Sequence, residues 1–235
     1  MANVKISELP TGTTLGSTDI VPVTASGITQ KFALSTWFSS PLLTQTQTSA
    51  VARGYASKAG DVVSALDFMT PAQIADVIGY TALVDVTSAL NAAFASVGKL
   101  VYCPAGNYKI TSNLTAPTCR GIIGEGWEDG NATAGTLFSC SGTVGFDIRG
   151  SDWEGPQILK DFYIGGTSIA SGVGLLIGNS ASAANNYAWT DGVVSNVRVT
   201  GWTGTNAVGV YHRDSNFCNF YDLHIDNCNA WYWAS

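Results

Sequence analysis

The second half of the chain repeats without gaps, and this repetition restricts the possible folds more than any other feature. One set of matching segments, VGFDIRG, VGLLIGN and VGVYHRD, begins at Val144, Val173 and Val208, 29 and 35 residues apart. A second set interleaves with it and comprises LKDFYIGG (159–166), VSNVRVTG (194–201) and FYDLHIDN (220–227). Periods of roughly 20 to 50 residues are typical of solenoids. Because the strand patterns recur in the same order while the loops vary in length, the sequence predicts parallel sheets and a parallel β-helix.

Strand alternation assigns a face to each column of these repeats, because successive side chains of a strand point to opposite faces. The expected inward columns are Val144, Val173 and Val208; Phe146, Leu175 and Val210; Phe162, Val197 and Leu223; and Ile164, Val199 and Ile225. His212 falls in a further inward column and is interpreted as a core histidine. Tyr163, Arg198 and His224 form an outward column. Alternation breaks at Asp161, Asn196 and Asp222, which predicts a corner where these side chains bond their own backbone.

Two helices are predicted before the repeats. In TPAQIADVIG, Thr70 and Gln73 form a capping box, Pro71 takes the first helical position and Gly79 ends the helix. Its expected apolar stripe is Ile74, Val77 and Ile78. The second helix lies in DVTSALNAAFASVG, with Gly98 as its expected end and a predicted apolar face of Val86, Leu90, Ala93, Phe94 and Val97. The next segment, KLVYCPAGNYKI (99–110), reads as strand, turn and strand.

The first forty residues are predicted to form a separate small β unit. Within them, DIVPVTASGITQKFAL reads as two strands joined at Ser26-Gly27. A lone hairpin is marginal in water, so the unit should depend on copies of itself or on another protein. The expected organisation is an anchoring β unit (1–40), a linker or stalk (41–60), a helical neck with a capping helix (61–98) and the first β-helix coils (99–235). The fold class is thus all-β dominated, and the coils are expected to continue beyond Ser235 because the last strand would otherwise leave an open edge.

Composition excludes several classes of function. Charged residues make up 12% of the chain, the net charge is −6 and the pI is about 4.7. No basic stripe indicates nucleic-acid binding. The N-terminus lacks the apolar region of a signal peptide, and no apolar run reaches the roughly 18 residues of a membrane span. Five cysteines without CxxC spacing favour buried thiols over disulfides or zinc. We therefore expect no cofactor, no metal site and no membrane insertion.

Several of these segments resemble a known family. DVTSALNAAFASVGKLVYCPAGNYKITSNL followed by GIIGEG is similar to the entry of the pectate-lyase-like right-handed parallel β-helix, with its capping helix and its Pro104, Gly106 and Tyr108 turn. LDFMTPAQIADV, VKISELP and DIVPV resemble bacteriophage tailspikes and tail fibres. A Gly-Asp-Gly-x-x-Asp-Asp run of that family is reduced here to Asp85. The resemblance implies a homotrimeric virion protein, assembled in the host cytoplasm, whose N-terminus binds phage tail or adaptor proteins and whose β-helix recognises host surface polysaccharide.

The sequence assigns no catalytic residue. Glycoside hydrolysis needs two carboxyl groups roughly 5 to 9.5 Å apart, and the strand columns pair none of the outward candidates, Glu125, Glu128, Asp129, Asp147, Asp152 and Glu154. The candidate carbohydrate-binding residues are Trp153, Tyr163, Arg198 and His224. Exposed tryptophans could stack on sugars, but a place in the interface between trimer subunits is favoured for Trp153, Trp189, Trp202, Trp231 and Trp233.

Three functions remain open from the sequence. The favoured one is a phage tailspike or tail fibre that recognises, and in its longer form could depolymerise, host polysaccharide. The second is a secreted pectate-lyase-like polysaccharide lyase, which would be expected to carry a signal peptide and a Ca²⁺-binding carboxylate cluster. The third is a purely structural tail fibre.

Overall fold

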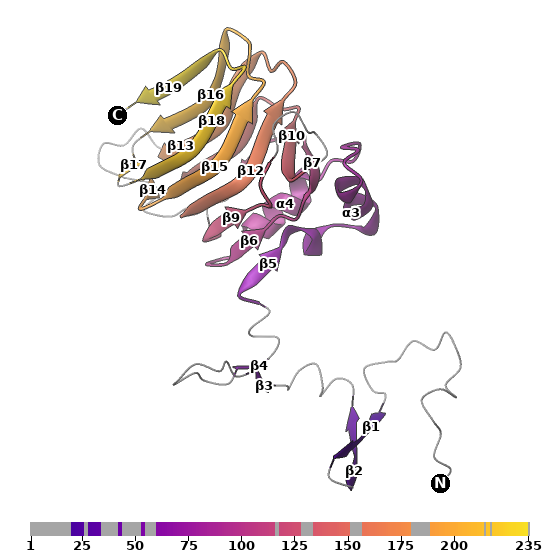
Figure 1. The fold of residues 1–235 in the computed structure, drawn as a ribbon. Coiled ribbons are helices and arrows are strands. Elements are labelled where there is room, and N and C mark those ends of the chain that lie inside the picture. Colours follow the sequence, from indigo (N-terminus) through magenta and orange to yellow (C-terminus); the bar gives the residue numbers. More distant parts are fainter. Residues whose placement is uncertain are drawn as a thin grey trace. The chain divides into compact units, whose positions relative to one another are not determined.

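The computed structural model places the repeats in parallel strands that stack coil upon coil (Figure 1). It describes residues 20–25, 28–33, 42–43, 53–54, 60–115, 118–127, 134–150, 157–179, 189–213, 215–216 and 218–234. The chain divides into two compact units, Met1–Asp61 and Val62–Ser235. The fold is all-β dominated, as the sequence predicts, and the described strands of the second unit pair with one another in parallel.

The described residues of the first unit form two short antiparallel pairs. Strands β1 (Ile20–Ala25) and β2 (Ile28–Ala33) form the predicted hairpin, with Ala25 opposite Ile28. Strands β3 (Leu42–Leu43) and β4 (Arg53–Gly54) pair within the segment interpreted from sequence as a linker. The division into an anchor and a linker stays a prediction.

The second unit contains two large sheets, and from Val144 onward the long strands alternate between them. The eight-stranded sheet has the order β18-β15-β12-β9-β6-β5, and β10 pairs with both β12 and β7; the five-stranded sheet has the order β19-β16-β13-β11-β8. The strands of the two sheets are β5 (Val62–Ser64), β6 (Leu100–Tyr102), β7 (Gly106–Ile110), β8 (Leu114–Thr115), β9 (Gly121–Ile123), β10 (Thr136–Cys140), β11 (Val144–Gly150), β12 (Ile158–Gly166), β13 (Ser171–Asn179), β15 (Val193–Thr200), β16 (Asn206–Arg213), β18 (Asn219–Asp226) and β19 (Ala230–Ala234). Two short strands, β14 (Trp189–Thr190) and β17 (Ser215–Asn216), form a separate parallel pair.

The register of these strands confirms the gapless alignment of the repeats. Val173 pairs with Val144 on one side and Val208 on the other, and Val194 pairs with Leu159 and Phe220 in the same way. Because each strand of one coil lies directly beside its equivalent in the next, the arrangement is that of a parallel β-helix.

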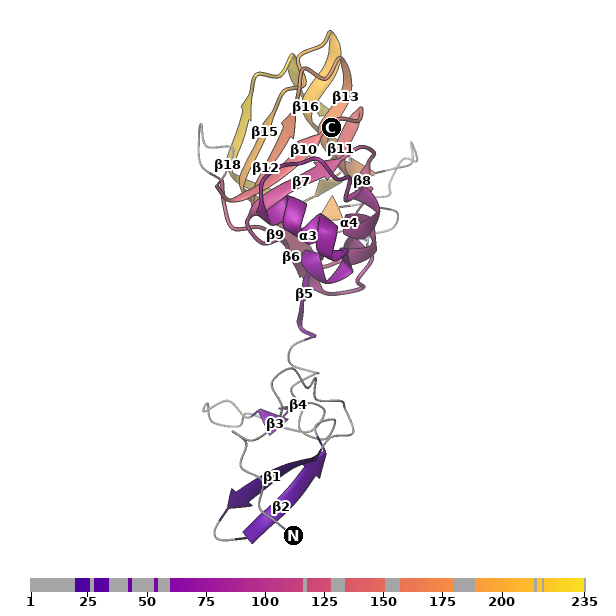
Figure 2. The ribbon, with the colours of Figure 1, turned by 90° about the vertical axis from the view of Figure 1, so that its right-hand side faces the viewer.

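Helices close the end of the coil next to β7 and β8 (Figure 2). They are the 3-10 helix η2 (Ala65–Phe68) and the α-helices α3 (Pro71–Ile78) and α4 (Thr87–Phe94). The capping box of Thr70 and Gln73 is present, and Gly79 caps the C-terminus of α3 as predicted. A Cβ on Gly106 would lie 2.5 Å from Cγ1 of Val77, so glycine lets α3 approach β7 closely.

Two details of the predicted helices are wrong. Helix α4 ends at Phe94, where the amide of Ala95 bonds the carbonyl of Asn91, so Gly98 lies beyond the helix in a left-handed turn. Val97 therefore leaves the helical face and is 77% exposed. Ile78, the last residue of α3, is 55% exposed, which leaves Ile74 and Val77 to face the core.

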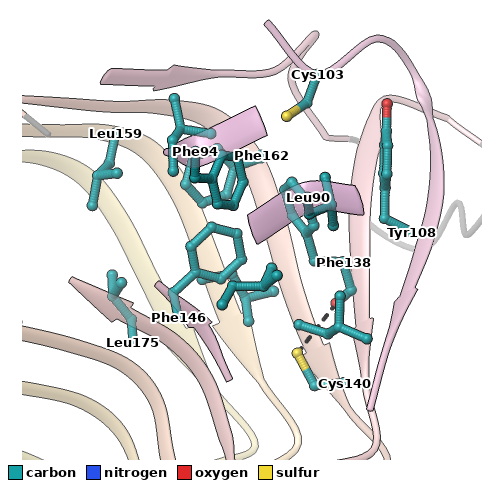
Figure 3. Close-up of a cluster of buried hydrophobic side chains, with 14 of the residues drawn as sticks. Leu90, Phe94, Cys103, Tyr108, Phe138, Cys140, Phe146, Leu159, Phe162 and Leu175 are labelled. Atoms are coloured by element: carbon teal, nitrogen blue, oxygen red, sulfur yellow. Dashed lines mark hydrogen bonds between the residues drawn. The ribbon is translucent and has the colours of Figure 1, made fainter. Parts of the chain in front are cut away.

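Aromatic rings fill the core where the helices meet the two sheets (Figure 3). The ring of Phe146 lies 4.8 Å from Phe138, 5.4 Å from Phe162 and 6.1 Å from Phe94, between centroids. All four side chains have no exposed surface. The cluster therefore joins α4, the eight-stranded sheet and the five-stranded sheet into one core.

The motif Pro-x-Gly-x-Tyr forms a turn between β6 and β7. The hydroxyl of Tyr108 donates a hydrogen bond of 2.8 Å to the carbonyl oxygen of Pro104, while its ring is fully buried against Phe138. No pairing joins β6 to β7; β9 continues the parallel column of β5 and β6, and β10 continues that of β7. The segment thus begins the first coil, as the sequence predicts.

Candidate functional site

The candidate site lies on the outer face of β12, β15 and β18, and a kink in each of these strands determines its shape. Asp161, Asn196 and Asp222 have φ values of 61°, 52° and 49°. This left-handed conformation is tolerated best by Asn and Asp among residues with a side chain. The predicted corner is confirmed. The predicted bond to the residue's own backbone is wrong for Asn196, whose Nδ2 donates 2.9 Å to Oδ1 of Asp161 on the preceding coil.

The kinks supply carbonyl groups to which the segment after β9 binds. The amide of Gly124 donates to the carbonyl of Lys160, and the amide of Gly126 donates to that of Asp161, both at 2.8 Å. A Cβ on Gly124 would lie only 2.2 Å from the carbonyl oxygen of Asp161. Glycine is therefore required for this close approach, which carries Trp127 across the outer face of the sheet.

Both the indole ring and the backbone of Trp127 are fixed by contacts with other segments. Its indole Nε1 donates 3.1 Å to the carbonyl oxygen of Asn196, two coils further along the axis. Its backbone forms an antiparallel bridge with Gly135, and the amide of Thr136 donates to the carbonyl of Gly126. The ring thus has a fixed place above β15 and β18.

The outward column predicted from sequence is confirmed, because Tyr163 pairs with Arg198 and Arg198 with His224 across β12, β15 and β18. Trp127 joins this column. Cζ of Arg198 lies 5.2 Å from the centroid of the Trp127 ring and 5.6 Å from that of the Tyr163 ring. The His224 ring meets Trp127 edge to face at 5.0 Å. We call Trp127, Tyr163, Arg198 and His224 the outer-face cluster.

A carboxylate completes the surroundings of Arg198. Nε and Nη2 of Arg198 donate to Oδ1 and Oδ2 of Asp226 at 3.2 and 2.5 Å. The hydrogen bond from Arg198 lowers the pKa of Asp226, and although partial burial opposes this, the charge of Arg198 and a hydrogen bond from Thr200 add to the lowering. The side chain of Arg198 is 17% exposed, whereas that of Asp226 is 46% exposed. Asp226 therefore presents an ionised, oriented carboxylate to solvent.

Gly165 makes room for the ring of Tyr163 in the outer-face cluster. A Cβ on Gly165 would lie 2.7 Å from a ring carbon of Tyr163, so the Tyr163 ring rests on the backbone of β12 where a side chain is missing. The ring lies flat enough to face Arg198, which stacks above it on the next coil.

Of the four sugar-binding candidates, the structure brings together Tyr163, Arg198 and His224, and Trp153 lies outside the described residues. Trp127 was not predicted, although it directly follows the quoted GIIGEG motif, whose glycines were the available signal. Trp202 is fully buried in the core, so the expectation of an exposed or interfacial ring is wrong for it. His212 is buried as predicted, and burial lowers its pKa.

The outward carboxylates predicted from sequence have different surroundings. Asp147 is only 9% exposed, although its position in β11 predicts an outward side chain, so an outward orientation does not expose it to solvent. Glu125 is exposed and accepts a hydrogen bond from the hydroxyl of Tyr102, which raises the pKa of Tyr102 to about 12. Glu128, Asp129, Asp152 and Glu154 lie outside the described residues. In the described part of the chain, no group of three His, Cys, Asp or Glu residues is arranged to hold a metal ion.

Fold and site together define an all-β protein with a parallel β-helix and an aromatic–guanidinium cluster on its outer face. No protein-family model matches the chain, and no curated protein matches it in sequence. A solved structure described as ORF18 of Geobacillus virus E2 is similar with a TM-score of 0.43 and 16% identity. The similarity covers 89% of this chain but 32% of that protein, so the chain spans about a third of its length. We draw no argument on function from a likeness of this degree.

Among the described residues, no helix is both long and apolar enough to span a membrane.

Proposed function

We propose that the chain belongs to a bacteriophage tailspike or tail fibre and binds host surface polysaccharide through the outer-face cluster. The observation that carries the proposal is the stack of Trp127, Arg198 and Tyr163 beside the exposed carboxylate of Asp226. Sugar rings offer apolar C–H faces and many hydroxyl groups, which match aromatic faces and a carboxylate acceptor respectively. Tyr163, Arg198 and Asp226 lie on strands of the sheet, where geometry is held more accurately than on a loop, and the hydrogen bond to Asn196 fixes Trp127 beside them.

The rest of the molecule fits this role. Parallel coils give a long, regular outer surface, and the tailspike-like segments quoted above extend over both compact units. We propose that residues 1–40 bind phage tail or adaptor proteins, that the chain is a homotrimer, and that it is assembled in the host cytoplasm and carried in the virion. The hairpin of β1 and β2 supports the first of these, because two strands alone have little stability in water.

A purely structural role for the cluster gives a different expectation. Arg198 and Trp127 also fasten the segment after β9 to the sheet. If that were their whole function, replacing Trp127 would lower stability and leave surface binding unaffected.

The test is a binding measurement on the full 235-residue chain. Capsular and lipopolysaccharide glycans from a panel of bacteria are titrated while intrinsic tryptophan fluorescence is recorded. We expect saturable binding that Trp127→Ala and Tyr163→Ala weaken about tenfold or more. Tyr221→Ala is the matched control, because Tyr221 is an exposed aromatic residue of β18 on the other side of the kink.

Two outcomes count against the proposal. Absence of binding across the panel contradicts polysaccharide recognition, and binding that Tyr221→Ala weakens as much as Trp127→Ala contradicts the placement of the site. The virion role has its own test: the chain should be detected by mass spectrometry in purified virions of a phage that encodes it. Deleting residues 1–40 should give protein that folds but does not join virions, and normal incorporation would refute the anchoring role.

A further inference from the structure

The outer-face cluster also indicates which class of sugar it accepts; this inference rests on the proposed function. An arginine recognises the carboxylate of an acidic sugar through its planar fork of N–H donors, in a bidentate pair. In this protein Asp226 already occupies the Nε and Nη2 donors of Arg198 in that manner. The guanidinium also lies near two aromatic rings, those of Trp127 and Tyr163. A ligand carboxylate would have to displace Asp226 to make the same pair.

The charges around Arg198 also oppose an acidic ligand. The charged side chains of β12, β15 and β18 are Lys160, Asp161, Arg198, Asp222 and Asp226. The carboxylates thus outnumber the cations, and Lys160 itself lies 3.4 Å from Asp161. Glu125, two residues before Trp127, adds another exposed carboxylate. Like charges close together repel, and a negative surface lowers the local concentration of a polyanion.

We propose that the site selects uncharged, hydroxyl-rich glycans over acidic ones, and that Asp226 determines this selectivity. Its carboxylate accepts hydrogen bonds from sugar hydroxyls and at the same time keeps the Nε–Nη2 edge of Arg198 from binding a ligand carboxylate. Trp127 contributes the ring face on which the apolar side of the sugar lies.

The decisive comparison uses the same polysaccharide with and without its charge. Acidic polysaccharides from the panel are assayed in native form and after chemical reduction of their uronic-acid carboxyl groups to hydroxymethyl groups. The wild-type chain should bind the reduced form about tenfold more tightly than the native form. Its affinity for the reduced form should change little with salt, because no ligand charge is screened.

Two variants distinguish the effect of removing the acceptor that pairs with Arg198 from the effect of removing one negative charge. Asp226→Asn removes one negative charge and the bidentate acceptor, so it should weaken binding of the uncharged form and strengthen binding of the native acidic form, each by about tenfold. Asp222→Asn removes an equal charge from the same strand, away from the Arg198 fork. It should change either affinity by less than about threefold.

The outcomes distinguish this inference from the proposed function. If native acidic polysaccharides bind as tightly as the reduced ones in a Trp127-dependent manner, the selectivity is refuted while polysaccharide recognition stands. If Asp222→Asn and Asp226→Asn have equal effects, Asp226 has no special role. If neither form binds, the proposed function fails and the inference fails with it.

Discussion

Replacing Phe146 by alanine should be among the most destabilising changes in the described part of the protein. Phe146 projects from β11 into the core and meets rings from α4, β10 and β12, at centroid distances of 6.1, 4.8 and 5.4 Å. It has no exposed surface. The substitution would therefore open a cavity at the point where the helical cap and both large sheets meet.

The expected loss in the free energy of unfolding follows from the area that the Phe146 side chain buries. An aromatic side chain buries about 150–250 Å², which at about 25 cal/mol per Å² corresponds to about 4–6 kcal/mol for the whole ring. Measured costs of Phe to Ala changes in cores are about 3–5 kcal/mol. Because three ring contacts are lost at once, we expect Phe146→Ala to lower the free energy of unfolding by about 4–5 kcal/mol.

The assay is equilibrium urea denaturation followed by tryptophan fluorescence, with the buried Trp202 as a reporter from the core. Phe68→Ala is the matched control, since Phe68 is 41% exposed and the same change should cost about 1 kcal/mol or less there. Phe146→Leu retains most of the volume and should lose about 1–2 kcal/mol, which gives a measurable value even if the alanine variant does not fold. Equal losses for Phe146→Ala and Phe68→Ala, or a loss well below about 1 kcal/mol for Phe146→Leu, would refute the shared aromatic core.

Further predictions concern the kink, an acidic group, the thiols and catalysis. Gly124→Ala should displace Trp127, because its Cβ would meet the carbonyl of Asp161 at 2.2 Å; a shifted tryptophan emission maximum would show this, and an unchanged spectrum would contradict it. Burial raises the pKa of Asp76, but hydrogen bonds from the Thr81 hydroxyl and the amides of Val84 and Leu83 outweigh it, so the folded pKa lies below the usual 3.8. The stabilisation from Asp76 should be fully present above pH 3.8 and should be lost as the pH falls through the lower pKa of the folded protein. If the urea midpoint is measured from about pH 2 to pH 6, Asp76→Asn should remove this part of its pH dependence. A thiol reagent should label the half-buried Cys218 and Cys228 of the native protein first. Cys103, Cys119 and Cys140 should react later, because they are buried and burial raises the pKa of each thiol. Equal labelling rates would refute this order. The 235-residue chain incubated with polysaccharide that it binds should release no new reducing ends or unsaturated products, and their appearance would show that a catalytic pair lies within it.

The sequence by itself determined the strand register and the face of most repeat residues. Phe162 and Val197 are buried and Tyr163 and Arg198 point outward, as alternation predicts. These predictions succeed because the period of a strand is local and because coils of matching sequence must stack their apolar columns together. The capping box at Thr70 succeeds for the same reason, since its bonds join residues three apart.

Only the tertiary structure decided where the chain crosses its own coils. Trp127 reaches the candidate site because Gly124 and Gly126 bind carbonyls of the next coil and the indole bonds Asn196, 69 residues further along the chain. No local period encodes such a contact. Val97 and Asp147 show the same limit: a helix that ends one turn early exposes Val97, whereas Asp147 is buried although strand alternation turns it outward. The pattern fixes which way a side chain points, whereas its exposure depends on segments that are distant in sequence and pack over it.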